Sequence, residues 1–267
     1  MIIIFLSWLI ITQNIIIVTN YSLTSEKIKE PIKIVVLSDL HNKQFGKDNV
    51  KLVQKIEAQM PDIIAVVGDM NMIDDTRTDI VTNILKELAD IAPVYYSLGN
   101  HENDAEMKSH ELSDAIKQID NVTLLVNESK EITVNGNKIS ILGLSDFAFG
   151  SKGTGRQKYY DMMDEFSKAD GYQLLLCHFP EYYPWFFEKH GNTFDLMLSG
   201  HAHGGVANIP FVGRLYAPNQ GWFPKYAYGE YNLPNGTMII TGGLGTSEEK
   251  IRINNPPEIL SVNISAK

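Results

Sequence analysis

The chain has 267 residues, a formal net charge of −9, 44% hydrophobic residues and a single cysteine, Cys177. At this length one large α/β domain, or at most two small ones, can bury a full core without disulfides. The excess of acidic residues excludes a protein that coats nucleic acid, because sequence-independent binding of phosphates requires clustered Lys and Arg. Five of the seven histidines are unusual, because they lie in short turn-like strings beside Asp, Asn, Cys or Gly: His41, His101, His178, His201 and His203.

The N-terminal residues 1–12, MIIIFLSWLIIT, are almost wholly apolar, and Gln13 and Asn14 interrupt the run. It is too short to cross a bilayer as a helix, which requires roughly 20 apolar residues. No small-residue cleavage site follows and no basic residue precedes it, which argues against a cleaved signal peptide. We predict that residues 1–13 are a partial membrane anchor or signal segment. The alternative is a buried N-terminal helix or strand.

The expected location is therefore a membrane, with the side left open. Lys27, Lys29 and Lys33 favour a cytoplasmic domain by the positive-inside rule, but Glu26 and Glu30 interleave with them. A soluble cytoplasmic protein is the second interpretation. We expect a monomer.

The first half of the chain predicts strand–loop–helix units. In residues 14–24 β-branched side chains dominate, and from Val18 onward polar and apolar side chains alternate in the way of an edge strand. Buried strands that end on polar residues are predicted at 32–39, 62–69 and 93–100. Helices are predicted at 47–60, before Pro61, and in TRTDIVTNILKELADI. This order is typical of a mainly parallel sheet with crossover helices, in which ligands bind beyond the carboxyl ends of the strands.

The second half is richer in hairpins. Residues 131–144 predict a hairpin about Asn135-Gly136, and residues 226–243 predict another about Pro234-Asn235-Gly236. Between them, the apolar runs at 173–180 and 194–205 both lead to histidines. With no fixed-period repeat in the sequence, we predict one domain over residues 14–267, with two packed sheets and helices outside.

Polar residues with metal-binding chemistry follow these predicted strands. They are Asp39, His41, Asp69, Asn100, His101, His178, His201 and His203. Imidazoles and carboxylates bind borderline cations such as Zn²⁺, Mn²⁺ and Fe²⁺, and the absence of cysteine among them excludes a thiolate-rich zinc site. Eight such groups exceed the needs of one ion, whereas two ions about 3.5 to 4 Å apart that share a carboxylate would use them well. The D-x-H and H-x-H spacings would send both side chains to one side of an extended strand tip.

The same strings resemble the motifs of the calcineurin-like metallophosphoesterase superfamily. That family has D-x-H, GD, GNH followed by an acid, a lone His, and GHxH. This chain has SDLHN, VGDM, GNHE, CHFP and SGHAHGG in the same order. The strings APNQGWFPKYAYG, GGLGTS and RINNPPE resemble the bacterial, often membrane-anchored branch. The resemblance covers residues 14–264 and implies a layered α-β-β-α sandwich of two mixed β-sheets flanked by helices.

The resemblance also implies a role for each site residue. Asp39, His41 and His203 would hold one divalent ion, and Asn100, His178 and His201 would hold a second. Asp69 would bridge them, and His101 would be a non-ligand that stabilises the phosphoryl group or protonates the leaving oxygen. The two cofactors would be Mn, Fe or Zn ions.

The predicted function is that of a dinuclear phosphoesterase, which hydrolyses a phosphomonoester or a phosphodiester of unknown identity through a metal-bound hydroxide. The alternative is a membrane-anchored metal-binding protein with a relic, non-catalytic site. A metallo-β-lactamase-like hydrolase is disfavoured because its H-x-H-x-D-H string is absent.

Two positions depart from the family patterns. Met72 stands where the phosphoprotein phosphatases have an Asp that orients the histidine of GNH, and Asp74, Asp75 or Glu102 are candidates to replace it. Val206 stands where the bacterial branch commonly has Gln after GHxHGG.

The remaining notable residues have plainer interpretations. We expect Cys177 to lie in the core, and His110 and His190 to lie on the surface. The aromatic run at 181–187 is expected to pack in the core, with a substrate wall or a lipid-facing surface as the alternative. The acidic loop at 74–79 is expected to be solvated.

Overall fold

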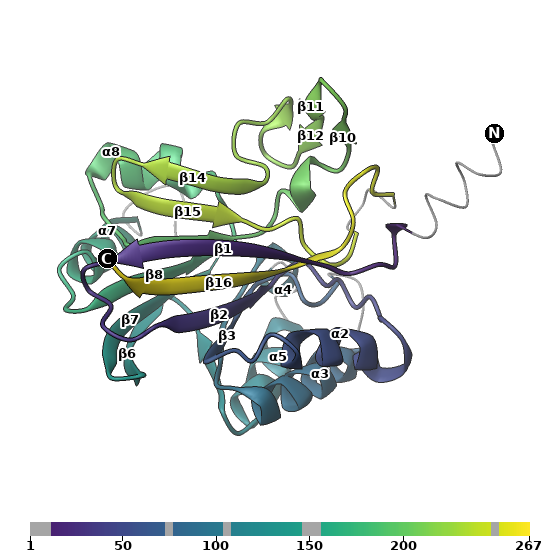
Figure 1. Ribbon diagram of the computed structural model, residues 1–267, viewed down its shortest axis with the longest axis horizontal. Helices are drawn as coiled ribbons and strands as arrows, with labels where there is room; N and C mark the ends of the chain where they lie inside the picture. Colours follow the sequence, from purple (N-terminus) through teal and green to yellow (C-terminus); the bar gives the residue numbers. More distant parts are fainter. Residues whose placement is uncertain (1–11, 73–76, 104–107, 146–155, 247–250) are drawn as a thin grey trace.

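The computed structural model contains two β-sheets that stack face to face, with helices on the outer faces (Figure 1). The structure describes residues 12–72, 77–103, 108–145, 156–246 and 251–267. Both large sheets mix parallel and antiparallel neighbours. The predicted α-β-β-α sandwich of two mixed sheets is therefore confirmed.

The first sheet has six strands, of which the central ones run parallel. In spatial order they are β1 (Ile17–Ser25), β16 (Glu258–Ala266), β2 (Ile32–Leu37), β3 (Ile63–Val67), β4 (Val94–Ser97) and β5 (Val122–Leu125). The second sheet also has six strands. In spatial order they are β14 (Gly229–Leu233), β15 (Gly236–Ile240), β9 (Leu196–Ser199), β8 (Tyr172–Cys177), β7 (Asn137–Leu144) and β6 (Glu128–Val134).

Short elements connect and cover these sheets. The small strands are β10 (Asn208–Ile209), β11 (Gly213–Arg214), β12 (Tyr216–Ala217) and β13 (Gly221–Trp222). The helices in the described ranges are η1 (Lys47–Asn49), α2 (Val50–Glu57), α3 (Thr78–Ile91), α4 (Asn100–Asn103), α5 (Lys108–Lys117), α7 (Gln157–Phe166), η3 (Tyr183–Phe187), α8 (Glu188–His190) and η4 (His203–Gly205).

Side-chain alternation along the central strands creates three apolar layers. On β2, Ile34 and Val36 enter the core between the sheets, whereas Val35 and Leu37 enter the core under the helices. This is the period of two that a strand imposes, here with both faces buried. The outer face of the second sheet packs under α7 and η3, and Cys177 lies in that core as predicted.

The strand predicted at 14–24 is β1, and it does form the edge of its sheet. It pairs in parallel with β16, so that Ile17 lies opposite Glu258. Figure 1 shows these two strands, from opposite ends of the chain, side by side. Both predicted hairpins are also present, as β6–β7 and β14–β15.

Several predicted elements are shorter in the structure. The helix predicted at 47–60 has its regular part only at Val50–Glu57. Asp48 and Asn49 have left-handed backbones, with φ of 52° and 59°, and Met60 is left-handed at 50°. Such residues cannot continue a right-handed helix.

The predicted anchor or signal segment at residues 1–13 falls outside the described residues, apart from Thr12 and Gln13. Among the described residues, no helix combines the length and the apolar character that crossing a bilayer requires. Within the aromatic run at 181–187, Tyr182, Tyr183 and Phe187 are buried in the outer core while Trp185 is partly exposed. Core packing is therefore the better interpretation of that run.

Candidate metal centre

All eight predicted site residues lie close to one another, beyond the carboxyl ends of five strands. The first sheet contributes five of them, and the second sheet contributes the other three. The residues follow β2 (Asp39, His41), β3 (Asp69), β4 (Asn100, His101), β8 (His178) and β9 (His201, His203).

The turns that aim these side chains are not extended strand tips, so that part of the prediction is wrong. Asp39 and His41 have φ of 54° and 49°, and His201 and His203 have φ of 63° and 46°. Left-handed backbone is uncommon outside glycine, although Asp, Asn and His adopt it more often than most residues. These tight turns bring the donor atoms together, and such backbone conformations concentrate at functional sites.

The first cluster consists of Asp39, His41 and His203, all buried. The Nε2 atoms of His41 and His203 lie 3.3 Å apart. Asp39 Oδ1 lies 3.6 Å from His203 Nε2 and 3.9 Å from His41 Nε2. Three donor atoms thus converge on one point, with contributions from both sheets.

The second cluster consists of Asp69, His178 and His201, with Asn100 beside it. Asp69 Oδ2 lies 3.1 Å from His178 Nε2. Asn100 Oδ1 lies 3.1 Å from His201 Nδ1. The carbonyl of Val67 lies 2.7 Å from His178 Nδ1, which leaves Nε2 directed at the cluster.

Asp69 also belongs to a third group, with His41 and His101. Asp69 Oδ2 lies 3.9 Å from the Nε2 atoms of both histidines. Asp69 Oδ1 accepts a hydrogen bond from the backbone N–H of His101 at 2.9 Å. The carboxylate therefore lies between the clusters. His101 lies close enough to Asp69 that both side chains could bind the same metal ion.

Burial controls the protonation of most of these groups. Burial lowers the pKa of His41 to about 3, and burial together with His178 lowers the pKa of His201 to about 3. Burial also holds the pKa of His203 well below its ordinary value. These imidazoles are therefore neutral at pH 7, which is the form that donates a lone pair to a metal ion.

Asp69 and His178 behave as a pair. Burial alone would raise the pKa of Asp69 and lower that of His178, but their mutual attraction outweighs it. The pKa of Asp69 is held below its ordinary value, and that of His178 is raised to about 10. A proton thus holds these two groups together, and a divalent cation could take its place.

The donor set fits divalent metal ions. Asp39 Oδ2 is buried and has no hydrogen-bond partner among the described residues. A buried carboxylate oxygen without a partner is costly unless a cation satisfies it. The oxygen and imidazole donors match the preference of Mn²⁺, Fe²⁺ and Zn²⁺.

Comparison with known proteins agrees with this geometry. Residues 32–205 match the family model of the calcineurin-like phosphoesterases. The chain belongs to the calcineurin-like phosphoesterase family. It is thus a metal-dependent hydrolase of phosphoric esters.

Relatives extend the likeness beyond the matched residues. A metallophosphoesterase of Campylobacter jejuni is 30% identical over 246 residues, which cover 90% of this chain but 61% of that protein. The phosphodiesterase YaeI of Escherichia coli is 27% identical over 240 residues, which cover 88% of this chain and 82% of the relative. The chain thus spans less than two thirds of the first of these relatives and most of the second.

Solved structures show the same fold. A 5′-nucleotidase precursor from Thermus thermophilus superposes with a TM-score of 0.51 at 14% identity, over 88% of this chain and 54% of that one. Protein TT1561 of the same organism superposes with a TM-score of 0.53 at 10% identity, over 80% of this chain and 90% of that one. At these identities the likeness concerns the architecture alone.

Within this phosphoesterase site, Glu102 stabilises the turns rather than providing a donor to the clusters described above. Its Oε2 accepts hydrogen bonds from the backbone N–H groups of Asp69 and Gly99, at 2.8 and 2.9 Å. Its Oε1 accepts hydrogen bonds from the Met70 N–H and the Tyr96 hydroxyl, both at 2.7 Å. Glu102 thus ties the β3 and β4 turns together. Asp74 and Asp75, the other candidates to orient His101, lie outside the described residues.

Two contacts to His201 were not predicted from the sequence. Asn219 Nδ2 lies 3.0 Å from His201 Nε2, and the Phe179 ring lies 4.2 Å from the His201 ring, centroid to centroid. Asn219 lies in a turn with no strand-end pattern, so nothing local marks it as a site residue. Phe179 was not marked either, because the proline that follows it indicates a turn and not a binding site.

Of the remaining histidines, His190 is exposed and stacks on Tyr160, as expected for a surface residue. The side chain of His110 lies outside the described part of the chain.

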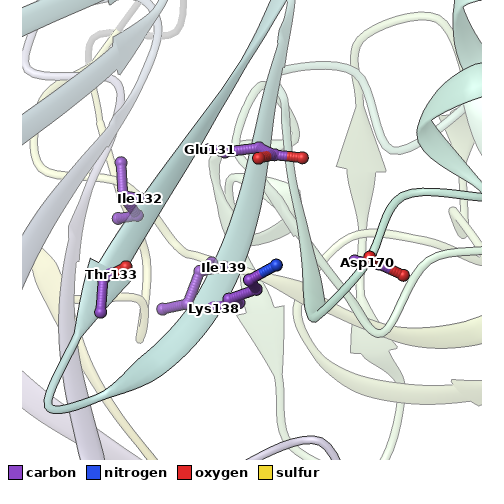
Figure 2. Close-up of a pocket in the computed structure, with 6 residues that line it drawn as sticks. All are labelled: Glu131, Ile132, Thr133, Lys138, Ile139 and Asp170. Atoms are coloured by element: carbon purple, nitrogen blue, oxygen red, sulfur yellow. The ribbon is translucent and has the colours of Figure 1, made fainter.

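A hollow of about 250 Å³ lies far from this site, on the β6–β7 hairpin (Figure 2). Charged side chains of Glu131, Lys138 and Asp170 surround it. Ile139 pairs with Tyr172 at the start of β8, whereas the metal centre follows Cys177 at its end. Five residues of strand, or roughly 16 Å, separate the two, so the hollow takes no part in the metal site.

Proposed function

We propose that the chain is a dinuclear phosphoesterase that hydrolyses a phosphomonoester or a phosphodiester. The position of Asp69 carries this proposal, since its Oδ2 lies 3.1 Å from His178 Nε2 and 3.9 Å from His41 Nε2. One carboxylate thus faces donors of both clusters, which is the arrangement that a pair of ions sharing a ligand requires.

The donor atoms divide into two sets. Asp39, His41 and His203 would hold one ion, and Asn100, His178 and His201 would hold the other, with Asp69 common to both. When bound, the two ions would lower the pKa of a water molecule, which supplies the nucleophile, and would neutralise charge on the phosphoryl oxygens. All of these donors except the half-buried Asn100 are buried, in turns that directly follow strands, and such support favours a preformed site.

His101 is proposed as the catalytic acid. Its side chain keeps 11% of its surface exposed, and its backbone N–H is held by Asp69 Oδ1. This leaves the ring beside the metal donors and accessible to a substrate. A proton on Nε2 would pass to the leaving-group oxygen. The group would then leave as a neutral alcohol, which is a better leaving group than the alkoxide.

The test is an assay of p-nitrophenyl phosphate and bis-p-nitrophenyl phosphate by purified protein, with metal content measured in parallel. We expect EDTA to abolish turnover and Mn²⁺, Fe²⁺ or Zn²⁺ to restore it. Turnover that survives complete removal of metal contradicts the proposal. Metal binding without turnover of either ester would identify the relic metal-binding protein instead.

The oligomeric state and the membrane association of the chain are also proposals. We propose that the chain is a monomer and that residues 1–13 associate it with a membrane. Carbonate extraction tests this association, and full release into the soluble fraction would contradict it. Sedimentation velocity tests the monomer.

A further inference from the structure

An arm of two small hairpins, residues 206–225, exposes an unusual amount of apolar surface. Phe211 is fully exposed, Trp222 is 68% exposed, Phe223 is 64% exposed and Val212 is also open to solvent. Figure 1 shows β10, β11 and β12 standing out from one edge of the sandwich. A cluster of large apolar side chains on a soluble surface marks an interaction site more often than single exposed residues do.

Backbone hydrogen bonds join the two hairpins into one small layer. The N–H of Leu215 donates to the Ala207 carbonyl at 3.0 Å, and the N–H of Phe223 donates to the Leu215 carbonyl at 2.9 Å. The Trp222 ring packs edge to face on Tyr216, with centroids 5.7 Å apart. The exposed aromatic residues are therefore held on an ordered support.

The charge of the arm differs from that of the chain. No acidic residue occurs between Asp195 and Glu230, although the whole chain carries a net charge of −9. Lys225 is exposed at the end of the arm. Aromatic residues beside a basic residue, on a segment that itself contains no acidic residue, suit the interface of an anionic bilayer.

The arm is also next to the place where the apolar N-terminal run ends. The side chain of Gln13 is bonded to the backbone of Arg252, whose N–H donates to Gln13 Oε1 at 3.1 Å. The neighbouring Ile253 is bonded to the arm, because its N–H donates to Val206 and its carbonyl accepts from Asn208. Ile251, which precedes Arg252 in the chain, is half exposed. The run at residues 1–12 thus joins the domain at the base of the arm.

We propose that residues 206–225 dock on the surface of an anionic lipid bilayer, with Phe211, Trp222 and Phe223 entering its interface. The same arm carries Asn219, which contacts His201. Docking therefore brings the edge of the metal centre close to the lipid surface. This inference concerns binding and does not depend on the proposed phosphoesterase activity.

Tryptophan fluorescence of the full chain tests the docking directly. Trp8→Phe with Trp185→Phe leaves Trp222 as the single tryptophan. Vesicles of equal parts phosphatidylcholine and phosphatidylglycerol should shift its emission to the blue, and brominated lipid should quench it. The matched control adds Trp222→Phe and Met60→Trp, because Met60 is 77% exposed after α2, and its emission should not change. Unchanged Trp222 emission overturns the proposal, even when the protein sediments with the vesicles.

Vesicle sedimentation gives a second readout. Phe211→Ser should weaken binding roughly tenfold, as expected for the loss of one buried phenylalanine, whereas Met60→Ser should not weaken it. Thermal melting should show both variants folded, since both residues are exposed. Equal binding by wild type and Phe211→Ser overturns the proposal. The proposal is also overturned if the wild-type protein is a dimer in the absence of vesicles and Phe211→Ser is a monomer. The arm would then be the contact between two copies of the chain.

Discussion

The two sheets contribute different chemistry to the metal centre although their central strands have the same parallel arrangement. The first sheet supplies the oxygen donors Asp39, Asp69 and Asn100, together with His41 and His101. The second sheet supplies imidazoles, from the turns after β8 and β9. Neither sheet alone supplies all the donors of either cluster, so the site exists only when the two layers are packed.

Removing Asp69 should have the largest effect, because this carboxylate contacts donors from both sheets. We expect Asp69→Ala to lose metal and activity together, as measured by elemental analysis and by turnover of p-nitrophenyl phosphate with Mn²⁺. Asp114→Ala, at an exposed aspartate on α5, is the matched control and should retain both. Wild-type turnover by Asp69→Ala would show that the site assignment is wrong.

His101 comes from the first sheet, like Asp39 and Asp69, but we propose that it acts in catalysis and does not bind metal. Its replacement therefore distinguishes the two roles. We expect His101→Ala to lower kcat by roughly 10² to 10⁴, the usual contribution of a positioned acid or base, while metal content stays the same. Steady-state kinetics and elemental analysis of one sample measure both quantities. Loss of a metal ion would instead make His101 a ligand, which its distance to Asp69 permits.

Gly200 tests the contact between the sheets beside the site. A Cβ atom there would collide with Ser38 Oγ and with the Asp39 carboxylate on the first sheet. We expect Gly200→Ala to lower the free energy of unfolding by about 1 to 3 kcal/mol, the cost of overpacking, and to weaken metal binding. Urea denaturation and metal titration measure the two effects.

The control for Gly200 is Gly191→Ala, where an added Cβ meets no atom within 4 Å. Its left-handed backbone, with φ of 72°, should cost about 1 to 2 kcal/mol. Metal affinity should stay the same. A weakened metal site in Gly191→Ala would mean that general destabilisation, rather than contact between the sheets, explains the result.

Glu181 is a buried carboxylate three residues after His178, and it belongs to none of the clusters described above. It accepts a hydrogen bond from Gln220 at 2.9 Å, and burial raises its pKa from 4.5 to about 7 in the metal-free protein. The unfolded chain therefore ionises first, so stability falls as pH rises from 4.5 to about 7. Glu181→Gln removes this loss.

We expect metal-free Glu181→Gln to be more stable than wild type at pH 8 by roughly 1 to 3 kcal/mol, and to lose this advantage near pH 4. Denaturation in EDTA at the two pH values measures the difference. An equal difference at both values would contradict the titration of Glu181.

Replacing Asn219 should have the smallest effect on the metal site. Asn219 lies outside the second sheet and contacts one donor from it, His201. We expect Asn219→Ala to weaken metal binding about tenfold, as is typical for a partner of a ligating histidine. Asn219 is exposed, but its left-handed backbone, with φ of 59°, should make the Ala variant less stable by about 1 kcal/mol. Titration with Mn²⁺ measures the affinity, with Asn232→Ala as an exposed control. Equal affinity in both variants would exclude a positioning role.

Local sequence patterns predicted much of this molecule. The strands that precede Asp39, Asp69 and His178 are short apolar runs, and such runs ending on polar residues predict the strands and the site edge together. The hairpins followed from turn residues such as Asn135-Gly136. The edge position of β1 followed from its alternation, but its partner β16 did not, because pairing between the two ends of the chain leaves no local pattern.

The sequence by itself determined which side chains form the centre, in which order they occur, and that each follows a strand. Only the tertiary structure decided their distances, since Asp39 and His203 are far apart in the chain yet lie 3.6 Å from one another. It also decided the left-handed turns in place of extended tips, the contact of Asn219 with His201 and the exposed arm. Periodicity and turn chemistry act between neighbouring residues, whereas these features arise from the packing of the two sheets against each other.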